Sequence, residues 1–326
     1  MRVHFWGTRG SLPASVNSET IRKKIFKVVK SASSLSFHSD EEIEKFLYNS
    51  FTNKNLPFSA IGSYGTNTSC IEIEGGDEYI LCDAGTGLRD FGNYVIKTMS
   101  QAHRQRPNVF NIFMSHLHWD HIQGFPFFTP AYMAGNQVNI YGLHKNLEHV
   151  FVTQQEPPFF PVPLKYMNAN ITFTALELGK TYDIAGITVK TIPQNHPGDS
   201  YGYRFEKDGK CIVYSTDSEH KEEAYEDNYP FIDFAMNADL LIFDAQYPLI
   251  DAISFKENWG HSSNIIGVEL SVKANVKHLC IFHNEPTLDD EKLDQFLEDT
   301  RRYLKIFSET SSLQIDLAYD GMQIEI

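Results

Sequence analysis

The run Ser115-His-Leu-His-Trp-Asp-His, residues 115–121, is the most informative stretch of this chain. Three imidazoles and a carboxylate within six positions are typical of a metal-binding cluster. The preceding residues, 108–114, are mostly apolar, with β-branched and aromatic side chains, and this pattern predicts a buried strand. The cluster then lies in the loop where that strand ends. Imidazoles suit zinc, iron or manganese, and a neighbouring carboxylate suits a hard divalent ion.

Three later residues also follow stretches that are predicted to be strands. His196, Asp217 and His283 each stand at or just beyond the carboxyl end of such a stretch. Because functional side chains gather on loops held by a rigid scaffold, we expect them to meet the first cluster. The predicted site has two metal positions. The expected ligands are His116, His118 and His196 for one ion, Asp120, His121 and His283 for the other, and Asp217 as the bridge between them.

The His-x-His-x-Asp-His pattern, together with the later His, Asp and His, resembles the metallo-β-lactamase fold superfamily. Three further stretches narrow the resemblance to the phosphodiesterase branch that includes ribonuclease Z and bacterial cyclic phosphodiesterases: Phe5-Trp-Gly-Thr-Arg-Gly-Ser, Gly65-Thr-Asn-Thr-Ser-Cys and Asp83-Ala-Gly-Thr-Gly. The resemblance covers almost all of the chain except residues 14–60. It implies a dinuclear centre between two layers of sheet and helix.

Strands and helices alternate along the chain without repeats or low-complexity linkers. This alternation predicts an α+β fold, a four-layer αββα sandwich of the metallo-β-lactamase type. No shift in composition marks a second domain, so residues 1–326 are expected to form a single hydrolase domain. The last residues, 313–326, are predicted to form a pair of strands around the turn Asp320-Gly321.

Residues 14–60 lie outside this scheme and predict a helical hairpin inserted into the domain. Ile21 and Ile25 belong to an apolar face at helical spacing, and Ser39 with Glu42 resembles a capping box that opens a second helix. The first helix is basic and the second acidic, so we expect their charges to neutralise each other. For the apolar faces two roles stay open, a lid over the metals and a dimer contact.

Composition restricts the class of protein. The net charge of −14 repels polyanions, which makes long nucleic acid an unexpected partner and favours small anionic substrates drawn by the metals. No membrane span or signal peptide is visible. The four cysteines lie in or beside predicted strands without Cys-x-x-Cys spacing, which indicates reduced thiols and a cytoplasmic protein. A homodimer is left open. The expected cofactor is a pair of divalent ions, zinc first, with manganese or iron as alternatives.

A proton donor for the leaving group is also predicted. His261 lies in Trp259-Gly-His-Ser-Ser just before a predicted helix, whose amino end attracts phosphate. The motif resembles the Gly-His-Ser of the ribonuclease Z branch, in which an acidic residue at a strand end partners the histidine, and Asp244 occupies that place. Asp244 is expected to raise the pKa of His261. The alternative is that His261 only caps the helix.

The remaining candidates support the centre or the substrate. Asp120 is expected to give a ligand oxygen to the catalytic centre rather than act as a base, and Asp83 to accept a hydrogen bond that orients the histidine loop. Thr8 and Arg9 could touch a substrate anion or make a structural turn. A group of aromatic side chains suggests the pocket, although most of them are expected to be core: Phe125, Phe127, Phe128, Tyr132, Phe159 and Phe160.

Three functions are consistent with these residues. The first is a phosphodiesterase that cleaves a small, cyclic or linear phosphodiester by attack of a metal-bridging hydroxide. The second is a carboxyl-ester, lactone or thioester hydrolase of the same fold. The third is a non-hydrolytic diiron redox or sensor protein. His261 with Asp244 favours the first function, and His118 argues against the third, since redox relatives commonly carry Glu there.

Overall fold

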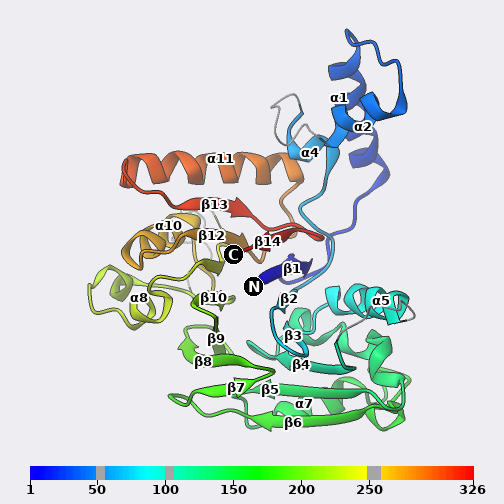
Figure 1. Ribbon diagram of the computed structural model, residues 1–326, viewed down its shortest axis with the longest axis vertical. Coiled ribbons are helices and arrows are strands. Elements are labelled where there is room, and N and C mark those ends of the chain that lie inside the picture. Colours follow the sequence, from blue (N-terminus) through cyan, green and yellow to red (C-terminus); the bar gives the residue numbers. More distant parts are fainter. Residues whose placement is uncertain (49–55, 100–105, 248–257) are drawn as a thin grey trace.

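The structure is a computed structural model that describes residues 1–48, 56–99, 106–247 and 258–326. Two seven-stranded sheets form its frame (Figure 1). In spatial order the first sheet contains β14 (Gln323–Glu325), β1 (Arg2–Gly7), β2 (Cys70–Glu74), β3 (Tyr79–Cys82), β4 (Val109–Phe113), β5 (Gln137–Gly142) and β6 (Asn170–Ala175). The second contains β13 (Gln314–Leu317), β12 (His278–Phe282), β11 (Leu240–Asp244), β10 (Lys210–Ser215), β9 (Ser200–Lys207), β8 (Ile187–Gln194) and β7 (Tyr182–Ile184).

Each sheet is mixed, with a parallel half and an antiparallel half. Strands β3 to β6 pair in parallel in the first sheet, and β10 to β13 do so in the second. The antiparallel pairs include the hairpins β2–β3 and β9–β10. Parallel strands are usually covered on both faces and therefore strongly apolar, as β3 and β11 are.

Helices flank the outer faces of both sheets. Their bounds are α1 (Ser18–Ala32), α2 (Asp40–Tyr48), α4 (Phe58–Ile61), α5 (Gly87–Met99), α6 (Trp119–Ile122), α7 (Leu147–Gln154), α8 (Pro230–Ala235), α10 (Asn264–Lys273) and α11 (Asp290–Phe307). Single 3₁₀ turns are η1 (Phe125–Phe127), η2 (Thr129–Tyr132), η3 (Leu164–Tyr166) and η4 (Glu222–Tyr225). None of the helices in the described ranges is long and apolar enough to cross a membrane.

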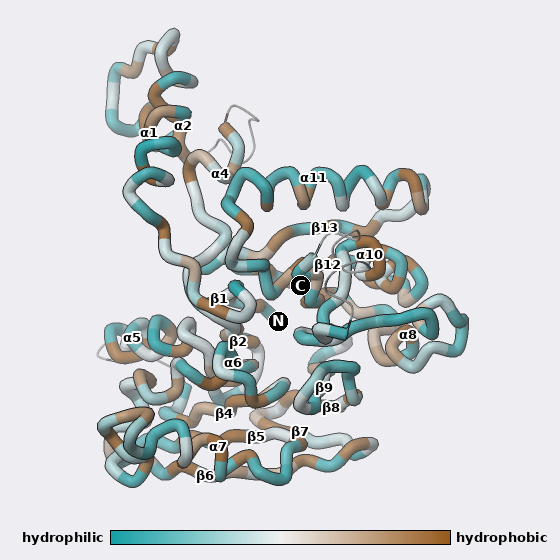
Figure 2. Tube along the Cα trace, turned by 180° about the vertical axis from the view of Figure 1, so that it is seen from behind, coloured by the Kyte–Doolittle hydropathy of each residue, from teal (hydrophilic) through white to brown (hydrophobic). Residues whose placement is uncertain are grey.

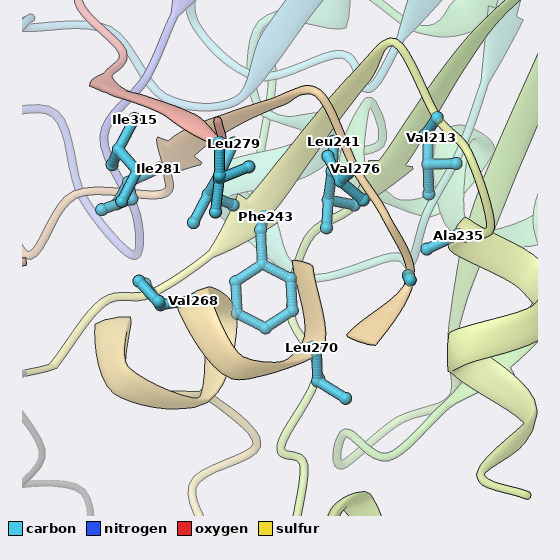
Figure 3. Packing of buried hydrophobic residues seen from close by; sticks show 14 of the residues in the cluster. Val213, Ala235, Leu241, Phe243, Val268, Leu270, Val276, Leu279, Ile281 and Ile315 are labelled. Atoms are coloured by element: carbon cyan, nitrogen blue, oxygen red, sulfur yellow. The ribbon is translucent and has the colours of Figure 1, made fainter. Parts of the chain in front are cut away.

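Three apolar cores hold these layers together. One lies between the two sheets and contains Phe5 and Phe282. Another joins the first sheet to α5 and α7, and the third joins the second sheet to α8, α10 and α11. In the third core, Phe243 of β11 points toward α10 (Figure 3). Gly267 of α10 permits this contact, since a Cβ there would stand 2.9 Å from the Phe243 ring.

The end of the chain differs from the prediction. The two strands expected to pair around the turn at Gly321 lie in different sheets, β13 beside β12 and β14 beside β1. Asp320 anchors the crossing between them, because its carboxylate accepts hydrogen bonds from the backbone N–H groups of Thr66 and Asn67. The prediction of a terminal strand pair is therefore wrong, although both strands exist.

Helices α1 and α2 project beyond α4 at one end of the molecule (Figure 1 and Figure 2). The sequence led us to expect that the lysines of α1 pair with the acidic helix α2. In the described residues Lys24 and Lys27 pair with α11 instead. Lys24 reaches Asp290 at 2.6 Å and Lys27 reaches Glu291 at 2.7 Å, both at the start of α11. The predicted neutralisation of α1 by α2 is thus not what the described residues show. These ion pairs attach α1 to the body of the protein.

Candidate metal centre

The polar residues of the site stand where the parallel strands of both sheets end. Asp83 follows β3, His116 lies beyond β4, Asp217 beyond β10, Asp244 ends β11 and His283 follows β12. Asp83, Asp217 and His283 have φ angles of 62°, 52° and 62°, a left-handed conformation that is uncommon for residues other than glycine. Such strained turns are found at functional sites, where surrounding structure holds them. The two sheets thus direct their strand ends at one place.

His116, His118 and His196 form the first group. The His118 Nδ1 and His196 Nε2 atoms lie 3.1 Å apart. The Nε2 of His116 is buried and has no hydrogen-bond partner in the described part of the chain. Burial holds the pKa of His116 well below its usual value, which keeps the imidazole neutral. A neutral imidazole is the form that binds a metal ion.

Asp120, His121 and His283 form the second group. Three atoms, Asp120 Oδ2, His121 Nε2 and His283 Nε2, make a triangle with sides of 3.2, 3.2 and 3.3 Å. Ligands held at 2.0–2.1 Å around a tetrahedral ion lie roughly 3.3 Å from one another. The triangle therefore has the size that a tetrahedral divalent ion requires.

Asp217 lies between the two groups. Its Oδ1 is 3.6 Å from His116 Nε2 and 3.8 Å from His196 Nε2. Its Oδ2 is 3.2 Å from His121 Nε2 and 3.4 Å from His283 Nε2. One carboxylate oxygen thus faces each group, as expected of a bridging residue.

Charge also indicates that the site takes cations. Burial alone would lower the pKa of His121, yet the carboxylates of Asp120, Asp217 and Asp83 raise it well above its usual value. Buried carboxylates at this density are costly unless a positive charge compensates them. The imidazole and carboxylate donors, their spacing and the unpartnered His116 nitrogen all fit a pair of divalent ions.

Asp83 supports the second group from behind. It accepts a hydrogen bond from His121 Nδ1 at 2.8 Å, and its other donors are the Ser115 backbone N–H and hydroxyl and the Tyr214 hydroxyl. A carboxylate in this position fixes the ring orientation and makes the facing nitrogen a better ligand. This is the contact that the sequence led us to expect for Asp83.

His261 and Asp244 also come together at the centre. His261 Nδ1 lies 2.7 Å from Asp244 Oδ2 and 3.8 Å from Asp217 Oδ1. Burial opposes the charged form, but Asp244 outweighs it and raises the pKa of His261 to about 9. The Nδ1–H group donates its hydrogen bond to Asp244, and in the protonated ring Nε2–H is a second donor. Ser263, rather than His261, caps α10 by accepting from the Ile266 N–H.

Thr8 and Arg9 prove to be structural. The Thr8 hydroxyl donates to the Tyr64 carbonyl, and the buried Arg9 guanidinium donates to the carbonyls of Gly65, Glu285 and Leu288. These contacts attach the first loop to the loop after His283, so of the two readings of this pair the structure shows the turn.

The aromatic side chains predicted for the pocket divide into buried and exposed ones. Phe125 and Phe128 are fully buried beneath the metal loop, whereas Phe127 is 55% exposed and packs against Phe160. Sequence reasoning missed Trp119, which stands within the metal motif and is largely exposed. It also missed the backbone N–H of Ser11, which donates to Asp120 Oδ2 at 2.7 Å and leaves no signal in the sequence.

A family model described as a beta-lactamase superfamily domain matches residues 78–284, more than half of the chain. The chain belongs to the metallo-β-lactamase superfamily. With its His/Asp site, it is a metal-dependent hydrolase of that fold. This superfamily also accounts for the two mixed sheets and their flanking helices.

Individual relatives agree with this assignment. Ribonuclease Z of Picrophilus torridus is 26% identical over 269 residues, which cover 66% of this chain and 81% of the relative. Among solved structures, the metallo-β-lactamase fold protein YhfI of Bacillus subtilis superposes with a TM-score of 0.64 at 17% identity, covering 100% of this chain and 98% of YhfI. A diphosphatase from the PhnP family superposes with a TM-score of 0.58 at 17% identity, covering 100% and 97%. At these identities the two structures bear on the fold alone.

Proposed function

We propose that this hydrolase is a dinuclear phosphodiesterase that cleaves a small, preferably cyclic, phosphodiester. The observation that carries the proposal is the His261–Asp244 pair, hydrogen-bonded at 2.7 Å and placed against Asp217. When hydroxide attacks a phosphodiester, one P–O bond breaks and the leaving group departs as an alkoxide that needs a proton. A histidine held by a carboxylate is suited to give one. The relative named ribonuclease Z supports phosphorus rather than carbon as the reacting centre.

The proposed metal ligands follow the two groups. His116, His118 and His196 would hold one ion, Asp120, His121 and His283 the other, and Asp217 both. We propose zinc, because five imidazoles and two carboxylates at tetrahedral spacing suit it best. When bound, two such ions lower the pKa of a water molecule toward neutrality and offset charge on the phosphoryl oxygens.

Groups of the protein itself would orient the metal ligands and supply the proton. Asp217 sets the separation of the two positions, since one of its oxygens faces each. Asp83 and the Ser11 N–H hold His121 and Asp120 in orientation. His261 Nε2 would donate its proton to the leaving oxygen while Asp244 balances the charge of the ring.

We further infer that residues 1–326 act as one domain and that residues 14–60 are a helical insertion in it. The family match begins at residue 78, after these helices. Their tie to the body through Lys24 and Asp290 supports a single unit.

The test uses the metal-loaded full-length protein. We expect cleavage of bis(p-nitrophenyl) phosphate, which stops on chelation and returns with added zinc. His261→Ala is expected to retain both ions and to lose turnover of a cyclic nucleotide, whose leaving group is an alkoxide, by roughly 10²- to 10⁴-fold. The loss should be much smaller on bis(p-nitrophenyl) phosphate, because nitrophenolate departs without a proton. Faster cleavage of a p-nitrophenyl carboxyl ester or a lactone would overturn the phosphodiesterase, and equal turnover of the cyclic nucleotide after His261→Ala would overturn the role of His261. Precursor transfer RNA belongs in the same panel, because faster cleavage of RNA would refute a small substrate.

A further inference from the structure

One large aromatic side chain stands exposed inside the metal motif itself. Trp119 lies between His118 and Asp120 and begins the short helix α6. The next residues of that helix are buried, but the Trp119 side chain is 78% exposed. Single exposed apolar residues are common on protein surfaces. This ring is different because both of its chain neighbours belong to the proposed metal centre.

A second exposed tryptophan lies close in sequence to a group that contacts His196, the histidine that faces His118. Trp259 is 57% exposed and precedes Gly260, whose carbonyl oxygen lies 2.9 Å from His196 Nδ1. On the other side of His196, the Nε2 atom lies 3.1 Å from His118, the neighbour of Trp119. The chain has three tryptophans, and the third, Trp6, packs against α5. Both exposed tryptophans are therefore one residue away from a group that contacts His196.

Trp119 and Trp259 together are called the rim here. Two exposed indole rings beside a metal centre favour a substrate that carries a planar ring. The faces of aromatic side chains bind nucleobases by stacking, and this is tolerant of base identity. With a net charge of −14, the protein surface offers little general attraction for a nucleotide. Binding energy would then come from the metals for the phosphate and from the rim for the base.

We propose that the substrate is a nucleobase-bearing phosphodiester and that its base stacks on Trp119. The inference rests on the proposed phosphodiesterase and adds its substrate class. Trp119 is a specificity residue in this reading. Trp259, across His196, is the other member of the rim.

The first experiment separates the base from the phosphodiester. We would assay wild type, Trp119→Ala and Trp119→Phe on the cyclic nucleotide that wild type cleaves fastest and on the same cyclic phosphate carried by a methyl riboside. Trp119→Ala is expected to raise KM for the nucleotide roughly 5- to 100-fold more than for the base-free compound, with a smaller effect on kcat. Trp119→Phe should recover most of this difference. Tyr225→Ala, another exposed aromatic residue, on η4, is the control.

The outcomes distinguish this inference from the proposed function. If the base-free compound is cleaved as efficiently as the nucleotide, or if Trp119→Ala weakens both equally, stacking is refuted while the phosphodiesterase stands. If neither compound is cleaved, the proposed function fails, and a nucleotide-binding measurement then tests the stacking contact by itself. Adenosine monophosphate titrated into metal-loaded protein should quench tryptophan fluorescence, and Trp119→Phe should abolish most of the quenching. Unchanged quenching in Trp119→Phe would overturn the contact in either case.

Discussion

The two halves of the metal centre use similar donors but differ in burial and in support. Asp120, His121 and His283 are buried, and His121 is held by the carboxylate of Asp83. In the other half the side chain of His118 is exposed, and His196 donates only to the backbone carbonyl of Gly260. A carboxylate behind an imidazole strengthens it as a ligand more than a neutral carbonyl does, because it stabilises positive charge on the ring. We therefore expect the buried position to hold its ion more tightly and the open position to meet solvent and substrate.

Removing the charge of the carboxylate proposed to bridge the two positions should abolish metal binding at both. Asp217→Asn removes the negative charge from the only side chain that the proposal assigns to both positions. We expect both ions to be lost together, with fewer than one ion per chain and no detectable turnover. Elemental analysis after gel filtration measures this. The control is Asp239→Asn, a buried carboxylate paired with Lys277 at the far end of β11, which should retain both ions. Retention of one full ion by Asp217→Asn would argue against a shared ligand.

Staged metal removal should separate the two positions. A chelator added in increasing amounts is expected to take the ion of the open position first, since His118 is exposed and the Nδ1 of His196 faces a carbonyl rather than a carboxylate. Activity should be lost with that first ion, while the second remains until higher chelator concentration. The measurement compares metal content with turnover across the titration. Simultaneous loss of both ions at every concentration would contradict unequal positions.

The support behind the buried position can be weakened by one substitution. Asp83→Asn keeps the size of the side chain but removes the charge that holds His121. Removing such a partner costs about 10- to 100-fold in metal affinity. We expect this loss at the buried position, so that the two affinities converge. If the affinity of the open position fell by the same factor instead, Asp83 would be a general stabiliser of the fold and not a support for one ion.

The proposed ligands could be placed from the sequence because most of them follow apolar strands. His116 and Asp217 could be assigned in this way, and the structure brings them together. The same reasoning failed at the carboxyl terminus, where Ile315 and Ile324 both follow the alternation expected of a strand. The two-residue alternation shows which face of a strand is buried, but it does not show which strand lies beside it. The strand pairing and the long-range contacts of Asp320 show that the chain crosses between sheets there.

The sequence also did not show which residues form ion pairs with the charged helices. The basic residues of α1 and the acidic residues of α2 are close in sequence, which suggested mutual pairing. Lys24 instead binds Asp290, which lies far along the chain and is buried, where an ion pair interacts more strongly than at the surface. The exposure of Trp119 could not be predicted from the sequence either, since tryptophans are highly buried on average.

The smallest expected effect concerns the loop that carries His196. His144 is buried, donates from Nε2 to the carbonyl of Asp199 at 2.7 Å and packs edge-on against Tyr201. This hydrogen bond holds the open position from behind, as Asp83 holds the buried one, but it acts through the backbone. A neutral hydrogen bond contributes about 0.5–1.5 kcal/mol, so His144→Ala should weaken metal binding at the open position roughly 2- to 10-fold. Competition with a fluorescent zinc indicator measures this, and His149→Ala, on the exposed face of α7, is the control. A loss confined to the buried position would reverse the assignment of supports, whereas a loss confined to the open one would support the role of His144 behind that position.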